Sequence, residues 1–425
     1  MGESVGMLLE LDVTGIAHGG ISVARHEGRV VFVTDAIPGE RVVARVSEDR
    51  KKSFWRADTV SVVTPSPFRR DHVWEAASLA RDPEERAGGA EFGHIDLAHQ
   101  RQLKRQVLVD AFARFAHVDI DALLGVPLTV VAAPGDDAAG GLGWRTRVRL
   151  HVDGSGTAGP YASRSHHVVA VDSLPLASAA VAAAAPLGRG AMPGAEVVDV
   201  IAPSAPAADG TIAGGRLVID AQAASVLTEQ VGERRFRVDD TGFWQVHGAA
   251  PAVLTAAVQT AVEPARLDPQ GQHLDLYGGV GLLAAALGDV VGDGFRVTSV
   301  ESAVAATEHA QENLAEWVGA RAETGRVDRW LRRTLDTASR AERGRLAAGT
   351  VVLDPPRAGA GRDVVESLAA LAPAQIVYVA CDPVALARDV ATFAALGYRL
   401  DAMAAHDLFP HTHHVEAVAR LMPAA

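Results

Sequence analysis

The chain has a single cysteine, Cys381, and it stands where a thiol could act as a nucleophile. It follows the apolar run "QIVYVA" and precedes Asp382 and Pro383, a pair typical of a helix start. The partial positive charge of a helix N-terminus favours a thiolate at this position. The carboxylate of Asp382 opposes that effect by like-charge repulsion. An inert cysteine in a core is the alternative interpretation.

Glu416 is the second candidate for chemistry, because a carboxylate in the apolar stretch "VEAVARLM" is costly unless it is partnered or functional. Three histidines precede it, His411, His413 and His414, and together they could handle protons for a thiolate. An outward-facing strand position is the alternative for Glu416. The histidines lack the spacing of a zinc site, so we expect no metal.

The stretch "DLYGGVGLLA" places Gly279 and Gly281 between a predicted strand and a predicted helix. Glycines let a backbone approach a ligand closely and bring a helix N-terminus beside it. The next predicted strand ends in Glu301, about 20 residues further on, where a carboxylate can accept both ribose hydroxyls of a nucleoside cofactor. A helix cap beside Ser302 is the alternative role for Glu301.

NAD and S-adenosylmethionine both fit that pattern, and "VVLDPPRAG" separates them. Asp354 followed by two prolines at a strand end gives a rigid loop over the reactive side of a cofactor. This arrangement is common in methyltransferases and favours S-adenosylmethionine. An ordinary turn at the end of a strand is the alternative.

The elements that must position these residues alternate between strand and helix over residues 241–425, which predicts an α/β fold with a doubly wound, Rossmann-like sheet. Ligands in such sheets bind at the carboxyl ends of the strands. Tyr277, Glu301, Asp354 and Cys381 all fall at predicted strand ends. We therefore expect them to share one site.

Short strands separated by glycine turns over residues 1–63 predict a small β-barrel. Residues 64–240 predict a central α+β domain, with a helix over 95–116 that carries a basic exposed face and helix and loop over 177–215. Two features suit RNA: "SFWR" after "DRKK", and three arginines on one predicted strand face, which would track phosphates. These arginines are Arg145, Arg147 and Arg149.

The net charge of −12 argues against a general polyanion binder, although local charge on the contacting face decides. One cysteine cannot form an internal disulfide or a cysteine-rich metal site, which fits a reducing cytoplasm. No apolar run reaches about 18 residues, and the first residues lack the features of a secretory signal. We expect a cytoplasmic protein without a membrane span.

Five motifs, "FWQVH", "DLYGGVG", "VVLDPPRAG", "YVACDPVALARD" and "FPHTHHVE", occur in the order found in one family. The chain resembles the S-adenosylmethionine-dependent RNA uracil-5-methyltransferases, which make 5-methyluridine in bacterial tRNA and 23S rRNA. The segment "GIAHGGISVARHEGRVVFVTDAIPGERV" resembles the TRAM domain, an RNA-binding, OB-like barrel. The resemblance implies a class I methyltransferase sheet and a structured RNA substrate, with 23S rRNA favoured over tRNA, and a monomeric protein.

The resemblance also implies roles for residues. Cys381 would be the nucleophile that adds to C6 of uracil, and Glu416 the base that removes the proton from C5. Contacts to S-adenosylmethionine would come from Gln245, Tyr277, Gly279, Gly281, Glu301 and Asp354.

The chain departs from the family in three places. Residues 84–106 contain none of the cysteines that hold an iron–sulfur cluster in many ribosomal members, so we expect no cluster. Asp382 replaces the usual asparagine and should raise the pKa of the thiol, and Gly278 replaces a frequent cysteine. Two other functions stay open: an amino-group methyltransferase that uses "DPPR" alone, and a catalytically silent RNA-binding protein.

Overall fold

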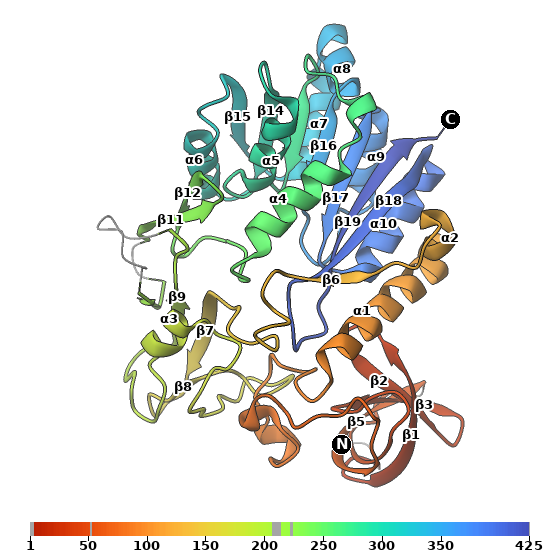
Figure 1. Cartoon of the computed structure of the whole chain (residues 1–425), viewed down its shortest axis with the longest axis vertical. Helices are drawn as coiled ribbons and strands as arrows, with labels where there is room; N and C mark the ends of the chain where they lie inside the picture. Colours follow the sequence, from red (N-terminus) through yellow and green to blue (C-terminus); the bar gives the residue numbers. More distant parts are fainter. Residues whose placement is uncertain (1–3, 52, 206–213, 222–223, 425) are drawn as a thin grey trace.

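The computed structural model describes residues 4–51, 53–205, 214–221 and 224–424. Figure 1 shows a small barrel at one end of the molecule, a large sheet with helices at the other, and a strand-rich region beside the barrel.

The N-terminal barrel is closed, with strand order β1-β2-β3-β5-β4. Its interior holds small apolar residues such as Leu11, Val31 and Ala57, which alternate with exposed residues along each strand. The predicted barrel is therefore confirmed. Its strands are β1 (Leu8–Ala17), β2 (Ile21–His26), β3 (Arg29–Thr34), β4 (Arg41–Glu48) and β5 (Phe54–Thr64).

The large sheet has the order β15-β14-β13-β16-β17-β19-β18-β6. The first five of these strands are parallel, and β19 enters antiparallel between β17 and β18. The strands are β6 (Val130–Ala132), β13 (His273–Leu276), β14 (Arg296–Glu301), β15 (Gly319–Thr324), β16 (Thr350–Leu353), β17 (Gln375–Ala380), β18 (Tyr398–Asp407) and β19 (Glu416–Pro423). The predicted doubly wound sheet is confirmed.

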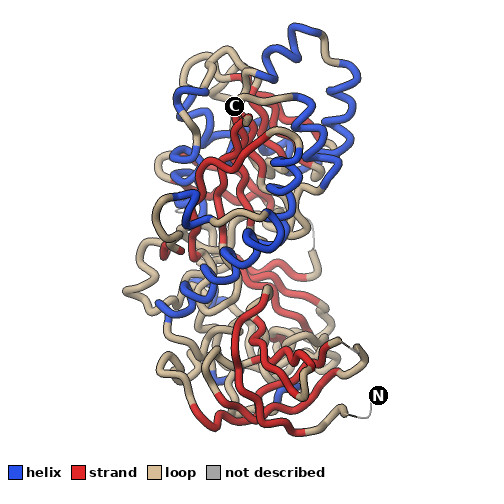
Figure 2. Tube along the Cα trace, turned by 90° about the vertical axis from the view of Figure 1, so that its right-hand side faces the viewer, coloured by secondary structure: helices blue, strands red, loops and turns tan. Residues whose placement is uncertain are grey.

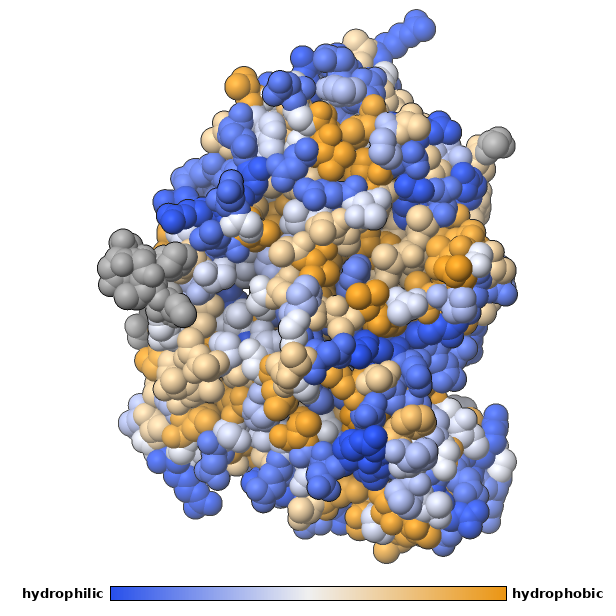
Figure 3. Space-filling view, in the orientation of Figure 1, coloured by the Kyte–Doolittle hydropathy of each residue, from blue (hydrophilic) through white to orange (hydrophobic). Residues whose placement is uncertain are grey.

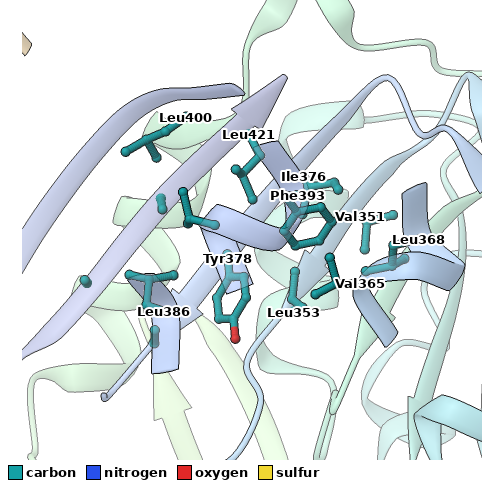
Figure 4. Packing of buried hydrophobic residues seen from close by; sticks show 14 of the residues in the cluster. Val351, Leu353, Val365, Leu368, Ile376, Tyr378, Leu386, Phe393, Leu400 and Leu421 are labelled. Carbon is teal, nitrogen blue, oxygen red and sulfur yellow. The ribbon is translucent and has the colours of Figure 1, made fainter. Parts of the chain in front are cut away.

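Helices cover both faces of this sheet, and Figure 2 shows the strands between them. Ile376 and Tyr378 of β17 point into one core, whereas Val377 and Val379 point into the other. Figure 4 shows Tyr378 among the leucines and valines of the first core. The helices are α4 (Ala250–Ala261), α5 (Leu282–Val291), α6 (Val304–Asn313), α7 (Val327–Thr337), α8 (Arg340–Ala347), α9 (Arg362–Leu371) and α10 (Pro383–Ala395).

Part of the segment 64–240, which was predicted as a central domain, packs against the large sheet. Helix α1 (Leu97–Ala111), extended by a π-helical turn (Phe112–Ala116), packs near α10, and β6 pairs in parallel with β18 at the sheet edge. The helix over 95–116 is confirmed, but its basic face is not wholly exposed. Lys104 is buried and its Nζ lies 2.6 Å from the carboxylate of Asp407. Helix α2 (Ile120–Leu124) precedes β6.

The remaining central region contains a four-stranded sheet of order β10-β9-β7-β8 and the hairpin β11-β12. In the span 177–215, predicted as helix and loop, α3 (Ala179–Ala184) agrees but β9 is a strand, and residues 206–213 lie outside the described part. The strands are β7 (Arg147–Val152), β8 (Ala158–Gly159), β9 (Val197–Ile201), β10 (Arg216–Ile219), β11 (Val226–Val231) and β12 (Arg234–Asp239). Three short 3-10 helices span Glu75–Ala77, Pro83–Glu85 and Pro264–Arg266.

On the face shown in Figure 3, hydrophobic and hydrophilic patches alternate over all parts of the molecule. Within the described ranges, we find no helix with the length and apolar character needed to cross a membrane.

Candidate active site at the carboxyl ends of the strands

Cys381 and Glu416 meet at the junction of β17 and β19. The antiparallel register pairs Ala380 with Ala417, so the next residues, Cys381 and Glu416, stand opposite each other. Glu416 is buried, with 4% of its surface exposed, whereas Cys381 is only partly buried. Two residues separated by 35 positions are thereby placed on one face at one end of the sheet.

Tyr277 and Asp354 follow the neighbouring strands β13 and β16, whose last residues are paired as Leu276 and Leu353. Both side chains line a small cavity that Gln245 and Gly279 also line. Gln245 comes from the segment before α4, so three separate parts of the chain converge here. A second cavity of about 450 Å³ lies on the other side of Tyr277 and reaches Ser302 and Asp328.

Glu301 joins the glycine loop to the start of α6. Its carboxylate accepts hydrogen bonds from the backbone N–H groups of Gly279 (3.3 Å) and Ala303 (2.9 Å). The N-cap role that the sequence left open for Glu301 is not observed, because the N-cap position of α6 is Ala303 and no side chain of the described residues caps that helix. The same position sets the carboxylate beside the glycine loop, where it lies within reach of a ligand.

The glycine loop leaves no room for a side chain at Gly278. A Cβ there would lie 2.1 Å from Oγ of Ser299 and 2.4 Å from a carboxylate oxygen of Asp275. At Gly279, by contrast, an added Cβ would meet nothing within 4 Å, and Gly281 starts α5 with φ of 92°. A side chain at position 278 would therefore require Asp275 and Ser299 to move.

The loop that follows Asp354 is tied to α10 by hydrogen bonds. The hydroxyl of Tyr378 donates to Asp389 (2.7 Å), and the backbone N–H of Ala360 donates to the same carboxylate (2.7 Å). Gly359 has φ of 84° and lies so close that a Cβ would be 2.7 Å from Asp389. The buried Tyr378 of Figure 4 therefore fixes the loop against α10.

Cys381 opens into a separate pocket of about 180 Å³. Its walls come from the turn between β1 and β2, from α1, from the loop after β16, from the start of α10 and from the loop between β18 and β19. The polar residues that line it are His18, Lys104, Arg357, Asp382, His413 and His414.

The charges around Cys381 raise its pKa instead of lowering it. Burial is the largest cause, the carboxyl groups of Glu416 and Asp354 add to it, and the pKa of the thiol reaches about 12. Arg357 acts in the opposite direction. Burial and the acids from other parts of the chain therefore outweigh the helix N-terminus, and Asp382 raises the pKa of the thiol as expected.

The two acids also hold their protons more tightly than usual. Burial raises the pKa of Glu416 well above its ordinary value, and the nearby Asp354 adds to the effect. Burial raises the pKa of Asp354 to about 7, with a contribution from Asp275. Burial therefore favours the protonated form of both acids.

The three histidines do not form one proton-handling group. His411 is buried and contacts the carbonyl of Gly140 (2.8 Å) and the amide of Gln100 (3.0 Å), so it holds the loop in place. His413 lies 3.7 Å from Glu91, and His414 lies 3.3 Å from Arg357. Among the described residues, no group of three potential ligands could hold a metal ion.

The three arginines predicted to track phosphates do not form a continuous basic face. Arg147 is paired with Glu229 at 3.0 Å and Arg149 with Asp199 at 2.8 Å. Arg145 precedes β7, and burial lowers the pKa of its guanidinium. Their charges are largely balanced within the protein.

Sequence reasoning missed three residues of the site. His18 of the barrel reaches Asp382, Asp275 is buried beneath the glycine loop with one carboxylate oxygen unpartnered, and His406 pairs with Glu416 across β18 and β19. The alternation around His273–Leu276 marks Asp275 as an acid in a buried strand. No pattern in the sequence points to His18 or His406.

The residues around Tyr277 fit an adenosine-containing cofactor. Tyr277 lines two cavities, and the glycine loop that leads into α5 lines one of them. The carboxylate of Glu301 and the buried, partly unpartnered carboxylate of Asp275 lie beside that loop. With the order of the sheet, this site defines an S-adenosylmethionine-dependent methyltransferase. The family model "tRNA (Uracil-5-)-methyltransferase" matches residues 222–422, and the TRAM domain model matches residues 3–54. The chain belongs to the RNA uracil-5-methyltransferase family.

Relatives of full length support this membership. A protein of Streptomyces coelicolor named an uncharacterized RNA methyltransferase is 39% identical over 99% of this chain and 94% of its own length. A Bifidobacterium longum protein with the same description is 36% identical over 98% and 97%. The structure of Pyrococcus abyssi tRNA (uracil-54, C5)-methyltransferase in complex with S-adenosyl-L-homocysteine matches with a TM-score of 0.67 at 21% identity, over 97% and 99% of the two chains.

Proposed function

We propose that this RNA uracil-5-methyltransferase acts on a uridine in structured RNA through a covalent bond between Cys381 and C6 of the base. The observation that carries the proposal is the register of β17 and β19. It sets the only cysteine of the chain opposite a buried glutamate, at the end of the sheet where the cofactor site lies.

The chemistry requires both residues. C5 of uracil is a weak nucleophile, and addition of the Cys381 sulfur to C6 converts the ring to an enolate whose electrons lie on C5. S-adenosylmethionine supplies the electrophilic methyl group. Glu416 then takes the proton from C5, the electrons of that C–H bond form the C5–C6 double bond, and the C6–S bond breaks so that sulfur leaves as a thiolate.

The burial of Glu416 suits a base for this step. A carboxylate with a raised pKa is a stronger base than an exposed one, and the pKa of Glu416 lies well above its ordinary value. Its carboxyl group must be ionised when the C5 proton leaves. Arg357 favours the thiolate form of the neighbouring Cys381, since it lowers the pKa of that thiol.

The cofactor contacts that the family resemblance implies remain proposals for this chain. Glu301 would hold the ribose hydroxyls, and Asp354 and Gln245 would approach the reactive end of the cofactor, because both line the small cavity with Tyr277. Gly279 and Gly281 would let the loop pass close to the cofactor.

The barrel offers a surface for RNA on its β3–β5 face. Phe32 and Phe54 lie with ring centroids 5.2 Å apart, and the guanidinium of Arg56 lies within 6 Å of each ring. Lys51 lies 5.7 Å from the ring of Phe54. Aromatic rings beside cations stack bases of single-stranded RNA and contact its phosphates. The target uridine in folded RNA must then be flipped out to reach Cys381.

The barrel does not decide between 23S rRNA and tRNA. The match to the P. abyssi protein covers 97% of the chain and so includes the barrel, and that protein is named for tRNA uracil 54. The preference for 23S rRNA, the monomeric state and a cytoplasmic location stay predictions.

The test is to map 5-methyluridine by mass spectrometry in rRNA and tRNA from cells with and without the gene for this chain. We expect one position to lose its methyl group, to regain it with the wild-type protein, and not to regain it with Cys381→Ala. A site restored fully by Cys381→Ala would contradict the covalent route. A chain that methylates neither RNA would contradict the proposed substrate.

A further inference from the structure

The N-terminal barrel contacts the active site directly through the turn between β1 and β2. Nε2 of His18 lies 2.7 Å from Oδ2 of Asp382, the residue that follows Cys381. The other oxygen of Asp382 accepts hydrogen bonds from the backbone N–H groups of Val384 (3.0 Å) and Ala385 (2.8 Å) and caps α10. Each oxygen of this carboxylate therefore has its own partner.

The turn that carries His18 is seated tightly against the catalytic part. Gly20 has φ of 70°, and a Cβ there would lie 2.3 Å from Cβ of His413 and 2.9 Å from the ring of Phe92. No side chain can stand at position 20 without moving the turn away. The backbone is thus shaped to bring His18 to the wall of the pocket that contains Cys381.

We propose that His18 is a positioning residue of the catalytic site, which holds Asp382 in its capping position and balances the negative charge beside the sulfur of Cys381. The proposal rests on the proposed role of Cys381 as the nucleophile. The proposal explains how the chain carries Asp382 next to Cys381, because His18 of the barrel supplies the compensating positive charge. The barrel would then take part in setting the reactivity of the thiol as well as in binding RNA.

The charged groups that face Cys381 come from several elements: Glu416 from β19, Asp354 and Arg357 from the segment after β16, and Asp382 from the start of α10. His18 faces Asp382 and, on α10, Arg388. The bond to Asp382 raises the pKa of His18, although burial and Arg388 oppose the shift. Burial acts to raise the pKa of Asp382, but His18 and the two capping N–H groups outweigh it, and the pKa falls. Each partner therefore favours the charged form of the other.

The chain's single cysteine makes a direct test possible, because alkylation of the intact protein reports on Cys381 alone. Rates of reaction with iodoacetamide, a neutral reagent, would be measured by intact mass from pH 6 to 10. The proteins are the wild type, His18→Gln, Asp382→Asn and the double variant. His26→Gln, a change elsewhere in the barrel, is the matched control, and circular dichroism checks that each protein is folded.

Below the pKa of the thiol, the alkylation rate should rise about tenfold per pH unit, because the thiolate fraction does so. In the wild type the rise should be smaller over the pH range where His18 loses its proton, because the positive charge that favours the thiolate is then lost. This inflection should be absent from His18→Gln and from Asp382→Asn. At pH 7, His18→Gln should react about three- to tenfold more slowly than the wild type, the expected effect of one charge at this range. Asp382→Asn should react faster, and adding His18→Gln to it should change the rate little.

Two results would overturn the proposal. In the first, His18→Gln slows alkylation by the same factor in the wild type and in Asp382→Asn. In the second, the pH profiles of alkylation are the same in all four proteins. The first would show a structural role for the turn, and the second no role in thiol reactivity. Alkylation needs neither RNA nor methyl donor. Failure here therefore leaves the methylation test with Cys381→Ala intact.

Discussion

Replacing Glu416 by glutamine should stop catalysis while leaving the fold almost unchanged. Glutamine has the shape of a protonated glutamate, and burial raises the pKa of Glu416 well above its ordinary value, so the substitution keeps the size of the side chain without burying a charge. We expect a change in the free energy of unfolding of less than about 1 kcal/mol at mildly acidic pH. A buried carboxylate replaced by alanine would instead leave a cavity.

The stability of the two proteins should diverge as pH rises. A carboxyl group with a raised pKa in the folded state contributes stability below its unfolded pKa, and this contribution is lost as pH rises toward the folded pKa. Wild type should therefore lose stability relative to Glu416→Gln above the ordinary pKa of a glutamate, by at most about 1.4 kcal/mol per pH unit. Denaturant unfolding at a series of pH values measures this difference.

The effect on turnover should be far larger than the effect on stability. Loss of a general base costs about 10²- to 10⁴-fold, or roughly 3–5 kcal/mol of barrier height. Because the base acts after the methyl group has moved, Glu416→Gln should accumulate RNA that is both methylated and bound to protein. Denaturing gels and mass spectrometry of a single-turnover reaction would detect this species. Turnover near the wild-type rate, or loss of RNA binding without any adduct, would refute the role of Glu416.

Two further predictions concern the cofactor and the framework of the site. Glu301→Ala should weaken S-adenosylmethionine binding by about 1.5–3 kcal/mol, measured by calorimetry. The control Glu308→Ala, on the exposed side of α6, should have little effect. Equal affinities for the wild type and both variants would exclude a ribose contact of Glu301. Lys104→Met should reduce the free energy of unfolding by about 3–5 kcal/mol, because it leaves Asp407 buried without a cation. Adding Asp407→Leu should restore much of that loss, and a single variant as stable as the wild type would contradict the importance of this pair.

Much of the fold could be predicted because the relevant signals are local. The order of strand and helix from residue 271 onward follows from hydrophobic runs and glycine turns, and the strand ends fall at Tyr277, Glu301, Asp354 and Cys381 as expected. Strand β15 and helices α7 and α8 give weaker local signals, because β15 has few apolar residues and both helices carry many charges. These elements cover one end of the sheet, so they bury fewer large side chains.

The errors lie where distant parts of the chain meet. The pKa of Cys381 was predicted from its own helix, but the groups that raise it come from β19 and from the loop after β16. The contact of His18 with Asp382 joins residues 364 positions apart. Lys104 was assigned to an exposed face, but it is buried against Asp407, which lies 303 residues later in the chain. Periodicity within one helix or strand carries no information about such partners.

The most direct test of the whole account is to trap the enzyme on its substrate. RNA that carries 5-fluorouridine at the methylated position should form a stable complex with the wild-type protein, because fluorine cannot leave C5 as a proton does. Mass spectrometry of the digested complex should place the modified base on the peptide that contains Cys381, and Cys381→Ser should give no complex. A complex linked elsewhere, or a protein that methylates normal RNA but forms no complex with the fluorinated RNA, would contradict the covalent mechanism.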